Sequence, residues 1–596
     1  MKLSHGTTGP ALFLCITLSA VAVADQHDQS PQKQAYFGDL HIHTRYSYDA
    51  FFFGTLASPD DAYRFAKGEP IPHASGREVV ISEPLDFYAV TDHAFFLGVW
   101  WRMKTDRDHP MAKELDVRSI VDNRNFGGAY TFDRSRLPGD VVLSAWKDTQ
   151  MAAERHNDPG TFTTFIAFEF TPDEFTDKPG INNLHRNIIY RGSRAPDTLI
   201  GRIETLNPEV LWDWLDRYRD QGMEAIAIPH NMNISGGRGF ELATFDGSPL
   251  TATWSEQRMR NEPLVEITQI KGSSDTHPFL SPNDEWADFE IAPYKLGGFG
   301  KITPQGSFVR DAWKRGLMLQ EEQGFNPYHF GVVAASDTHG FSEQSFDSTF
   351  VGEEEPPISP GRGSIPVSTD DGMRGYLETP SRYYGGSGVT GVWAKANTRD
   401  VIFDALRSKE TFGTSGPRIR VRFVGGYDLG TAASAAPGAP LPSSAVPQGG
   451  DLKAHSASPQ FLVWALADPN QGRLQRMQVI KGWYEDGNAH EKVFDVACSD
   501  GLAVDPTTRR CPDNGARVDL ATCSATEDVG AGELKTLWTD PEFKPTLSAF
   551  YYVRVLENPS CRWSTRDAIR TGVPPRPDLA ATTQERAWSS PIWVVP

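Results

Sequence analysis

The chain has 596 residues, which is too long for one ordinary domain, so we expect two. Hydrophobic residues make up 39% of the sequence and aromatic residues 11%, which is enough apolar material for packed cores and argues against global disorder. The formal net charge of −19 argues against a nucleic-acid-binding surface, because phosphate contacts need clustered lysine and arginine side chains. It leaves room for a local basic pocket that takes a small anionic substrate.

The N-terminus has the pattern of an export signal. Lys2 precedes a short apolar run over residues 11–23, and small residues at 22–24 end just before Asp25. We therefore expect residues 1–24 to be a signal peptide and the protein to be periplasmic or secreted, with a buried N-terminal helix as the alternative. No later stretch approaches the ~20 apolar residues that span a bilayer, so we expect no integral membrane segment after cleavage.

Between residues 35 and 418, short apolar runs alternate with amphipathic stretches. The apolar runs have the length and composition of buried strands, and they cover residues 36–42, 85–91, 162–170, 187–191, 224–229, 264–270 and 330–335. Helix-like segments cover residues 59–66, 208–219, 307–323 and 398–409. This alternation predicts an α/β fold with a mainly parallel sheet. Seven strands without an open-sheet fingerprint favour a closed, distorted (βα) barrel.

Two long connections interrupt this pattern. Residues 95–160 are rich in aromatic and charged side chains, including Trp100 and Trp101, and we expect an ordered lid there. Residues 341–395 are rich in glycine, proline and acidic residues, so a functional lid and a disordered segment both stay open.

Residues 419–596 read as a smaller, β-rich C-terminal domain. Antiparallel strands are predicted near residues 418–424, 461–466, 477–484 and 550–556, and residues 431–450 have the composition of a loop or linker. The domain holds four cysteines, Cys498, Cys511, Cys523 and Cys561. In an exported protein they predict two disulfides with three possible pairings, and a zinc cluster is the alternative.

Ligand-type residues recur at one end of strand after strand in residues 35–418. His41 and His43 end the first run at positions i and i+2, where the side chains of an extended chain point the same way. Asp337 and His339 repeat this spacing after the last run. In a parallel barrel that end carries the active site. The predicted metal ligands are His41, His43, Asp49, His93, Glu169, His185, His230, Asp337 and His339.

These ligands are too numerous for one metal ion. We therefore expect two or three divalent ions, of zinc, manganese or iron. We expect His185, Asp92 and His277 to move protons, with orientation of a histidine as the alternative role of Asp92. Three basic side chains are candidates for binding an anionic substrate, with a scaffold role as the alternative. They are Arg186, Lys271 and Arg238.

Residues 36–417 resemble the PHP (polymerase and histidinol phosphatase) superfamily, within it an exported and poorly characterised branch. The matching motifs are residues 39–44 (DLHIHT), 90–93 (VTDH), 228–231 (IPHN) and 335–339 (ASDTH), and Glu169 and His185 match the intermediate ligands. Asp49 lies one residue later than the family's usual acidic ligand. Residues 411–418 (TFGTSGPR) are similar to a closing motif of PHP-like esterases, including carbaryl hydrolases. The resemblance implies a distorted seven-stranded barrel that holds a trinuclear metal site.

The leading functional hypothesis is a periplasmic phosphoesterase that acts on a small phosphomonoester or phosphodiester, which rests mainly on the resemblance. The closing motif suggests a carboxyl-ester or carbamate hydrolase as the alternative, and the aromatic residues of 95–160 favour an organic substituent on the substrate. A metal-holding binding protein is the second alternative.

Overall fold

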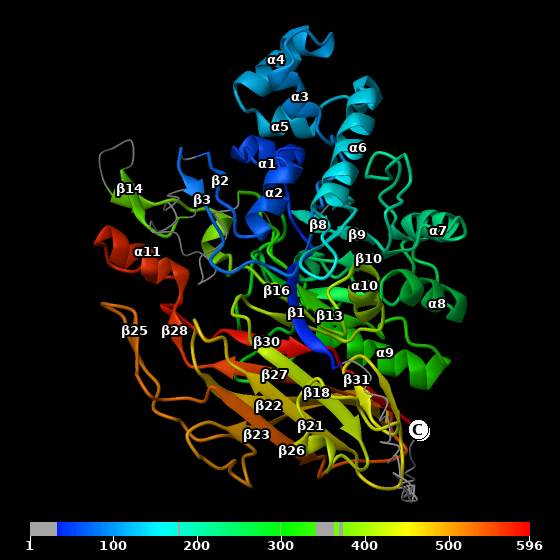
Figure 1. Ribbon diagram of the computed structural model, residues 1–596, viewed down its shortest axis with the longest axis vertical. Coiled ribbons are helices and arrows are strands. Elements are labelled where there is room, and N and C mark those ends of the chain that lie inside the picture. The colour runs from blue at the N-terminus through cyan, green and yellow to red at the C-terminus, as the bar shows by residue number, and fades with distance from the viewer. Residues whose placement is uncertain (1–31, 75, 177–178, 299, 341–362, 369–373) are drawn as a thin grey trace, which may run out of the picture.

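The computed structural model describes residues 32–74, 76–176, 179–298, 300–340, 363–368 and 374–596 (Figure 1). The predicted signal peptide, residues 1–24, lies outside the described residues, and so do residues 341–362 and 369–373 of the connection predicted as either lid or disordered segment. Among the helices that the structure describes, none has both the length and the apolar character needed to cross a membrane.

Strands form at all seven apolar runs of the N-terminal part. They are β1 (Gln34–Asp39), β4 (Phe87–Ala89), β5 (Thr163–Phe165), β6 (Ala167–Phe170), β9 (Arg186–Tyr190), β10 (Ala225–Pro229), β11 (Leu264–Gln269) and β13 (Gly331–Ala334). The run over residues 162–170 gives two of these strands, β5 and β6. Apart from β1, the strands of this list are fully buried, in agreement with the predicted strand type.

The pairing of these strands is mixed. β1, β4 and β5 are parallel, and so are β11 and β13, whereas β9 runs antiparallel to both β6 and β10. The short link from β6 to β9 carries a hairpin of β7 (Asp173–Phe175) and β8 (Ile181–Asn183), and its described residues include none of the crossover helix that usually connects parallel strands. Single bridges join Ile42 to Thr338 and His93 to Glu169. The fold is therefore mixed α/β, and the closed seven-stranded barrel stays a prediction.

The predicted helices form close to their expected bounds. They are α2 (Pro59–Ala66), α7 (Pro208–Arg219), α9 (Val309–Gln323) and α10 (Arg399–Arg407), with α8 (Ala252–Asn261) in addition. Ser58 begins α2 with a capping box to Asp61, and the Asn207 side chain caps α7 by accepting from Glu209. Proline at the first position of both helices adds a local start signal.

The connection over residues 95–160 is largely helical. Its helices are α3 (Val99–Thr105), α4 (Leu115–Asp122), α5 (Phe126–Tyr130) and α6 (Gly139–His156). In Figure 1, α3, α4 and α5 stand together above α1 (Tyr48–Phe53), at the end of the molecule far from the C-terminal strands. A separate cluster of buried apolar residues, which includes Phe52, Trp100 and Val117, holds these helices against α1. The prediction that this segment is ordered is confirmed, and its action as a lid stays a prediction.

The C-terminal part is built from antiparallel strands. They include β18 (Arg420–Gly426), β21 (Gln460–Leu466), β22 (Leu474–Glu485), β23 (Asn488–Cys498), β26 (Glu533–Thr539), β27 (Ala549–Glu557), β30 (Arg586–Ser589) and β31 (Ile592–Val595). Two disulfides, Cys498–Cys511 and Cys523–Cys561, confirm the predicted number and select one of the three pairings. α11 (Trp563–Thr571) follows the second disulfide.

One large sheet joins the two parts of the chain. Its order is β20-β31-β27-β30-β17-β16-β1-β4-β5, where β16 (Val389–Ala394) and β17 (Thr411–Thr414) lie between β1 and the C-terminal strands and β20 covers Asp451–Lys453. Strands from both sides of residue 418 thus share hydrogen bonds, through β17 and β30. The assignment of residues 35–418 and 419–596 to two domains stays a prediction.

A buried ionic network also links the two parts. Arg310 of α9 and Arg554 of β27 both donate to the Asp284 carboxylate, at 2.9 Å and 2.7 Å. Burial acts to raise the pKa of Asp284, but the two guanidinium groups hold this pKa well below its usual range. Removal of the carboxylate would take away the acidic partner that these two buried cations share and leave them with Asp275.

Candidate metal centre

His41 and His43 follow β1 and lie at the centre of the site. As their i, i+2 spacing predicts, both rings face the same acidic side chains. The Nε2 atom of His41 lies 3.4 Å from Glu169 and 3.3 Å from Asp337, and the Nε2 atom of His43 lies 3.3 Å and 3.2 Å from the same two carboxylates. All four side chains are buried.

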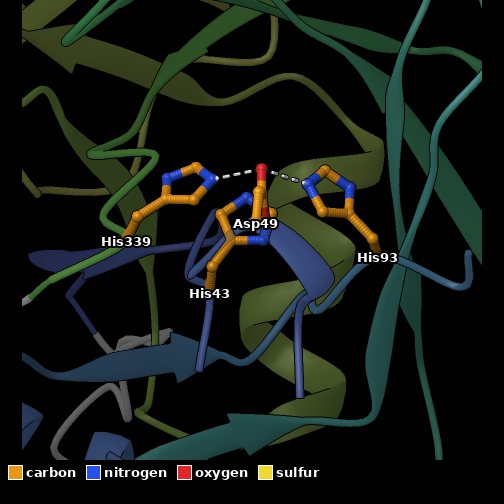
Figure 2. Close-up of side chains that lie close together, drawn as sticks. All are labelled: His43, Asp49, His93 and His339. Carbon is orange, nitrogen blue, oxygen red and sulfur yellow. Dashed lines mark hydrogen bonds and ion pairs between the residues drawn. The ribbon is translucent and has the colours of Figure 1, made fainter. Parts of the chain in front are cut away.

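One group of potential ligands surrounds Asp49, as Figure 2 shows. The Asp49 carboxylate lies between His93 and His339, 3.1 Å from one Nε2 atom and 3.0 Å from the other, and the His43 ring lies beside it. Asp49 is on the first turn of α1, whereas the three histidines follow strands β1, β4 and β13. Four nearby donors of this type can hold one metal ion.

Three further groups adjoin the first and share members with it. They are His41, His43 and Asp337; His41, His230 and Glu266; and Glu169, His185 and His230. Within each group the candidate ligand atoms lie within 4.8 Å of one another. The structure thus brings all nine predicted ligands together in one continuous cluster, which we call the metal cluster, and adds Glu266 as a tenth. Their binding of metal stays a prediction, and neither the number nor the identity of the ions follows from this geometry.

The donor atoms of the metal cluster fit divalent cations. Several are buried and have no hydrogen-bond partner among the described residues: Nε2 of His41 and His43, both ring nitrogens of His230, Oε2 of Glu169 and Oε1 of Glu266. Buried polar atoms in folded proteins are otherwise almost always paired. A mixture of imidazole and carboxylate donors suits zinc, manganese or iron.

At His41 and Glu169 the electrostatics favour the forms that bind cations, whereas at His93 the carboxylates of Asp49 and Glu169 outweigh burial and raise the pKa to about 10. Burial, together with the neighbouring His230, lowers the pKa of His41 well below its usual value, so the ring is neutral. Burial acts to raise the pKa of Glu169, but the surrounding histidines hold it well below its usual range, so this carboxylate is ionised. Neutral imidazole and ionised carboxylate are the protonation states that coordinate a metal.

Glu266 is the exception among the acidic residues. It lies in the middle of β11, and its Oε2 atom is 3.0 Å from Nδ1 of His41. Burial raises its pKa well above the usual value, and the nearby Asp39 and Glu169 carboxylates add to this shift. Sequence analysis did not select Glu266. The sequence does hold a signal for it, which is a single acidic residue inside a predicted buried strand, since a buried charge is costly without a partner.

His185 lies between two carboxylates. Its Nδ1 atom is 2.7 Å from Glu169, and its Nε2 atom is 2.8 Å from Asp173. Asp173 also accepts hydrogen bonds from Tyr130 and from Arg202. Sequence analysis did not select Asp173, Tyr130 or Arg202, which come from separate elements. A carboxylate of this kind fixes the orientation and tautomer of a metal-binding histidine.

The other two predicted catalytic residues occupy different positions. Asp92 is buried and accepts from the backbone N–H groups of Thr44 and Ser47, so it stabilises the turn after β1. None of its hydrogen bonds among the described residues goes to a histidine ring. The His277 ring packs against Phe308, 5.5 Å between ring centroids, and its Nδ1 atom accepts from the Phe279 backbone. The structure does not bring His277 into the metal cluster.

The three basic side chains predicted to bind substrate lie in different parts of the structure. The Lys271 ammonium contacts the Asp337 carboxylate and borders a cavity of about 190 Å³, which Tyr294 and Tyr383 also line. Burial lowers the pKa of Lys271 to about 8.

Arg186 and Arg238 lie in a different cavity of the described structure, away from that of Lys271. Arg186 donates to Glu262 at 2.9 Å, and Arg238 donates to Glu174 at 3.1 Å. Lys271 is therefore the one of the three that the structure places in contact with the metal cluster.

Comparisons with known proteins give one family match. The family model described as "Protein of unknown function (DUF3604)" matches residues 30–596. Among solved structures, the chain is similar to a two-domain protein from Bacteroides vulgatus that contains a predicted PHP-like metal-dependent phosphoesterase, with 9% identity and a TM-score of 0.28. That match covers 87% of this chain and 90% of the other, and likeness at this level supports no conclusion about fold or activity. No curated protein matches the chain.

Proposed function

The chain belongs to the DUF3604 family, and from its own site we propose that it is a metal-dependent hydrolase, specifically a phosphoesterase acting on a small phosphomonoester or phosphodiester. One observation carries the proposal: ten buried histidine, aspartate and glutamate side chains from separate elements converge, and several of their donor atoms have no hydrogen-bond partner among the described residues. The motifs shared with the PHP superfamily support phosphate chemistry. The two disulfides fit an exported protein, which supports a periplasmic or secreted location.

The ions would be held by the metal cluster. Bound divalent ions supply a nucleophile at neutral pH and polarise an oxygen of the substrate. Glu169, which faces His41, His43 and His185, would be one of the ligands, and so would His41, His43 and His230, which belong to two groups each.

The remaining polar groups of the site have separate roles. Asp173 holds the His185 ring in place through Nε2 and is a positioning residue. The Lys271 ammonium, between Asp337 and the adjoining cavity, is placed to bind an anionic oxygen of the substrate and to offset charge that develops there.

A second candidate, a carboxyl-ester or carbamate hydrolase with the same cluster, is favoured by the aromatic rings that border it. Tyr48 lies 5.2 Å from the His93 ring, and Phe53 lies 5.8 Å from the His339 ring. Apolar rings beside the reaction centre suit a substrate with an organic substituent.

A hydrolysis screen of the full-length, metal-loaded protein tests the proposal. The substrates are 4-nitrophenyl phosphate, bis(4-nitrophenyl) phosphate, 4-nitrophenyl acetate and 1-naphthyl N-methylcarbamate. We expect hydrolysis of a phosphate ester that stops on chelation and returns with zinc, manganese or iron. A preference for the acetate or the carbamate over both phosphates would replace the first candidate with the second. Hydrolysis that survives complete metal removal would contradict both.

A further inference from the structure

A row of aromatic side chains extends outward from the metal cluster. We define the aromatic row as Phe53, Phe126, Tyr130 and Phe175. Three of its members are large apolar side chains that solvent reaches: Phe53 and Phe175 are each 56% exposed, and Phe126 is 38% exposed. Contiguous exposed apolar side chains at the edge of a polar site mark ligand-binding surfaces.

The rings of the aromatic row lie next to one another. Phe53 and Phe126 are stacked with centroids 5.9 Å apart, Phe126 and Tyr130 are stacked at 6.3 Å, and Tyr130 meets Phe175 edge-on at 6.0 Å. These distances fall within the range of favourable aromatic pairs. The row therefore forms a continuous aromatic surface.

Helix α1 connects this surface to the metal cluster. Asp49 and Phe53 are at positions i and i+4 of α1, which places them on the same face of the helix. His339 contacts both of them: its Nε2 atom lies 3.0 Å from the Asp49 carboxylate, and its ring lies 5.8 Å from the Phe53 ring. A group bound on Phe53 would thus lie directly beside the cluster.

Buried residues hold the row in a fixed position. The Arg202 guanidinium lies over the rings of Tyr130 (4.7 Å) and Phe175 (5.8 Å), and it is paired with Asp173 at 2.7 Å. Tyr48 is buried between the His93 ring and the Phe126 ring. Preformed rings lose little conformational freedom when a ligand binds, which favours a flat ligand group.

We propose that the aromatic row is a substrate subsite that binds a flat, apolar group, such as an aryl ring, attached to the reacting centre. This inference rests on the proposed hydrolase function. The subsite assigns Phe53 and Phe126 as specificity-determining residues, supplied by α1 and by the helical connection of residues 95–160. In Figure 1, α5 stands directly above α1, in agreement with their ring contacts.

Binding of two phosphonates to the metal-loaded, full-length protein tests the subsite without turnover. Phenylphosphonate and methylphosphonate share a tetrahedral anionic group, which resembles a phosphate product as well as the tetrahedral species of ester hydrolysis, and they differ in the apolar group. We expect calorimetry to give about tenfold tighter binding of phenylphosphonate, because an aryl ring gains both area burial and stacking. In the double variant Phe53→Ala/Phe126→Ala, the ratio of the two affinities should fall towards one.

Leu115→Ala is the matched control. Leu115 is an apolar residue of the same helical connection, 84% exposed on α4, and it makes none of the ring contacts of the aromatic row. Its variant should keep the wild-type ratio. Equal binding of the two phosphonates, no binding of either, or an unchanged ratio in the double variant would overturn the subsite.

The hydrolysis screen fails or succeeds independently of this measurement. Preferential binding of phenylphosphonate by a protein that hydrolyses none of the four esters would contradict the hydrolase and leave the aromatic row as a binding site for an aryl group. Hydrolysis with equal phosphonate affinities would refute the subsite alone.

Discussion

Replacement of Glu266 by glutamine should weaken metal binding and stabilise the metal-free protein. The substitution Glu266→Gln keeps the shape of the side chain and removes its charge. Glu266 lies 3.0 Å from Nδ1 of His41, and its other oxygen has no hydrogen-bond partner among the described residues. Whether it binds an ion or orients His41, loss of the carboxylate should lower the affinity for metal about 10–100-fold, which corresponds to about 1.4–2.8 kcal/mol.

The effect on the metal-free protein has the opposite sign. Burial raises the pKa of Glu266, so the folded chain holds the proton more tightly than the unfolded chain. This contribution to stability is fully present below the usual glutamate pKa and is lost as pH rises through the raised pKa. At neutral pH the wild-type protein without metal therefore carries a cost that glutamine removes. The free energy of unfolding of Glu266→Gln should exceed that of the wild type at pH 7, and the difference should vanish near pH 4.

Two measurements check the predicted loss of metal affinity and the predicted gain in stability of the metal-free protein. Competition with a chromophoric chelator gives the metal affinity, and urea unfolding in the presence of excess chelator at pH 4 and pH 7 gives the stability of the metal-free protein. Glu69→Gln is a suitable control, because Glu69 is an exposed glutamate that pairs with Arg64 outside the metal cluster. An unchanged metal affinity, or a metal-free variant less stable than the wild type at pH 7, would refute the reasoning.

Three further outcomes follow from the structure. His41→Ala and Asp337→Ala should each lose metal and hydrolysis together, and full activity in a variant that binds less than one ion would contradict the metal mechanism. Asp284→Asn should lower the free energy of unfolding by about 3 kcal/mol, because it removes a carboxylate that two buried arginines share although both keep Asp275 nearby, while elemental analysis should show an unchanged metal content. Cys498→Ser opens a disulfide between residues 13 apart and should cost about 2–4 kcal/mol in urea unfolding; loss of bound metal in that variant would show that the C-terminal strands support the metal cluster.

Local signals explain which elements were predictable from the sequence. The bounds of α2 and α7 agree with prediction because both helices begin with proline after a capping side chain, Ser58 or Asn207. The position of β9 was also predictable, because Ile188, Ile189 and Tyr190 form an apolar run flanked by the polar residues Asn187 and Arg191. Its antiparallel direction was not, since strand direction depends on the whole connection and on the partner strands.

The same distinction holds for the metal cluster. The shared direction of the His41 and His43 side chains could be predicted from their spacing, because the i, i+2 geometry of an extended chain is local. The surroundings of Arg186 could not, since its partner Glu262 is 76 residues away in the chain. Glu266 and Asp173 were missed for a related reason: each is one acidic residue without a motif, and only the fold places it beside a histidine.

The unfavourable free energy of burying the polar atoms of the metal cluster indicates that the cluster binds cations. Each buried polar atom without a hydrogen-bond partner costs about 1–3 kcal/mol. Six such atoms among the described residues belong to His41, His43, Glu169, His230 and Glu266. Bound cations would offset this cost, so a metal-holding protein explains the cluster as well as an enzyme does. A purely structural site, however, needs neither an ammonium group at the edge of a cavity, as Lys271 provides, nor exposed rings beside His339. Both features lie where a substrate would approach the ions, and on these grounds we favour a hydrolase over a metal-holding protein.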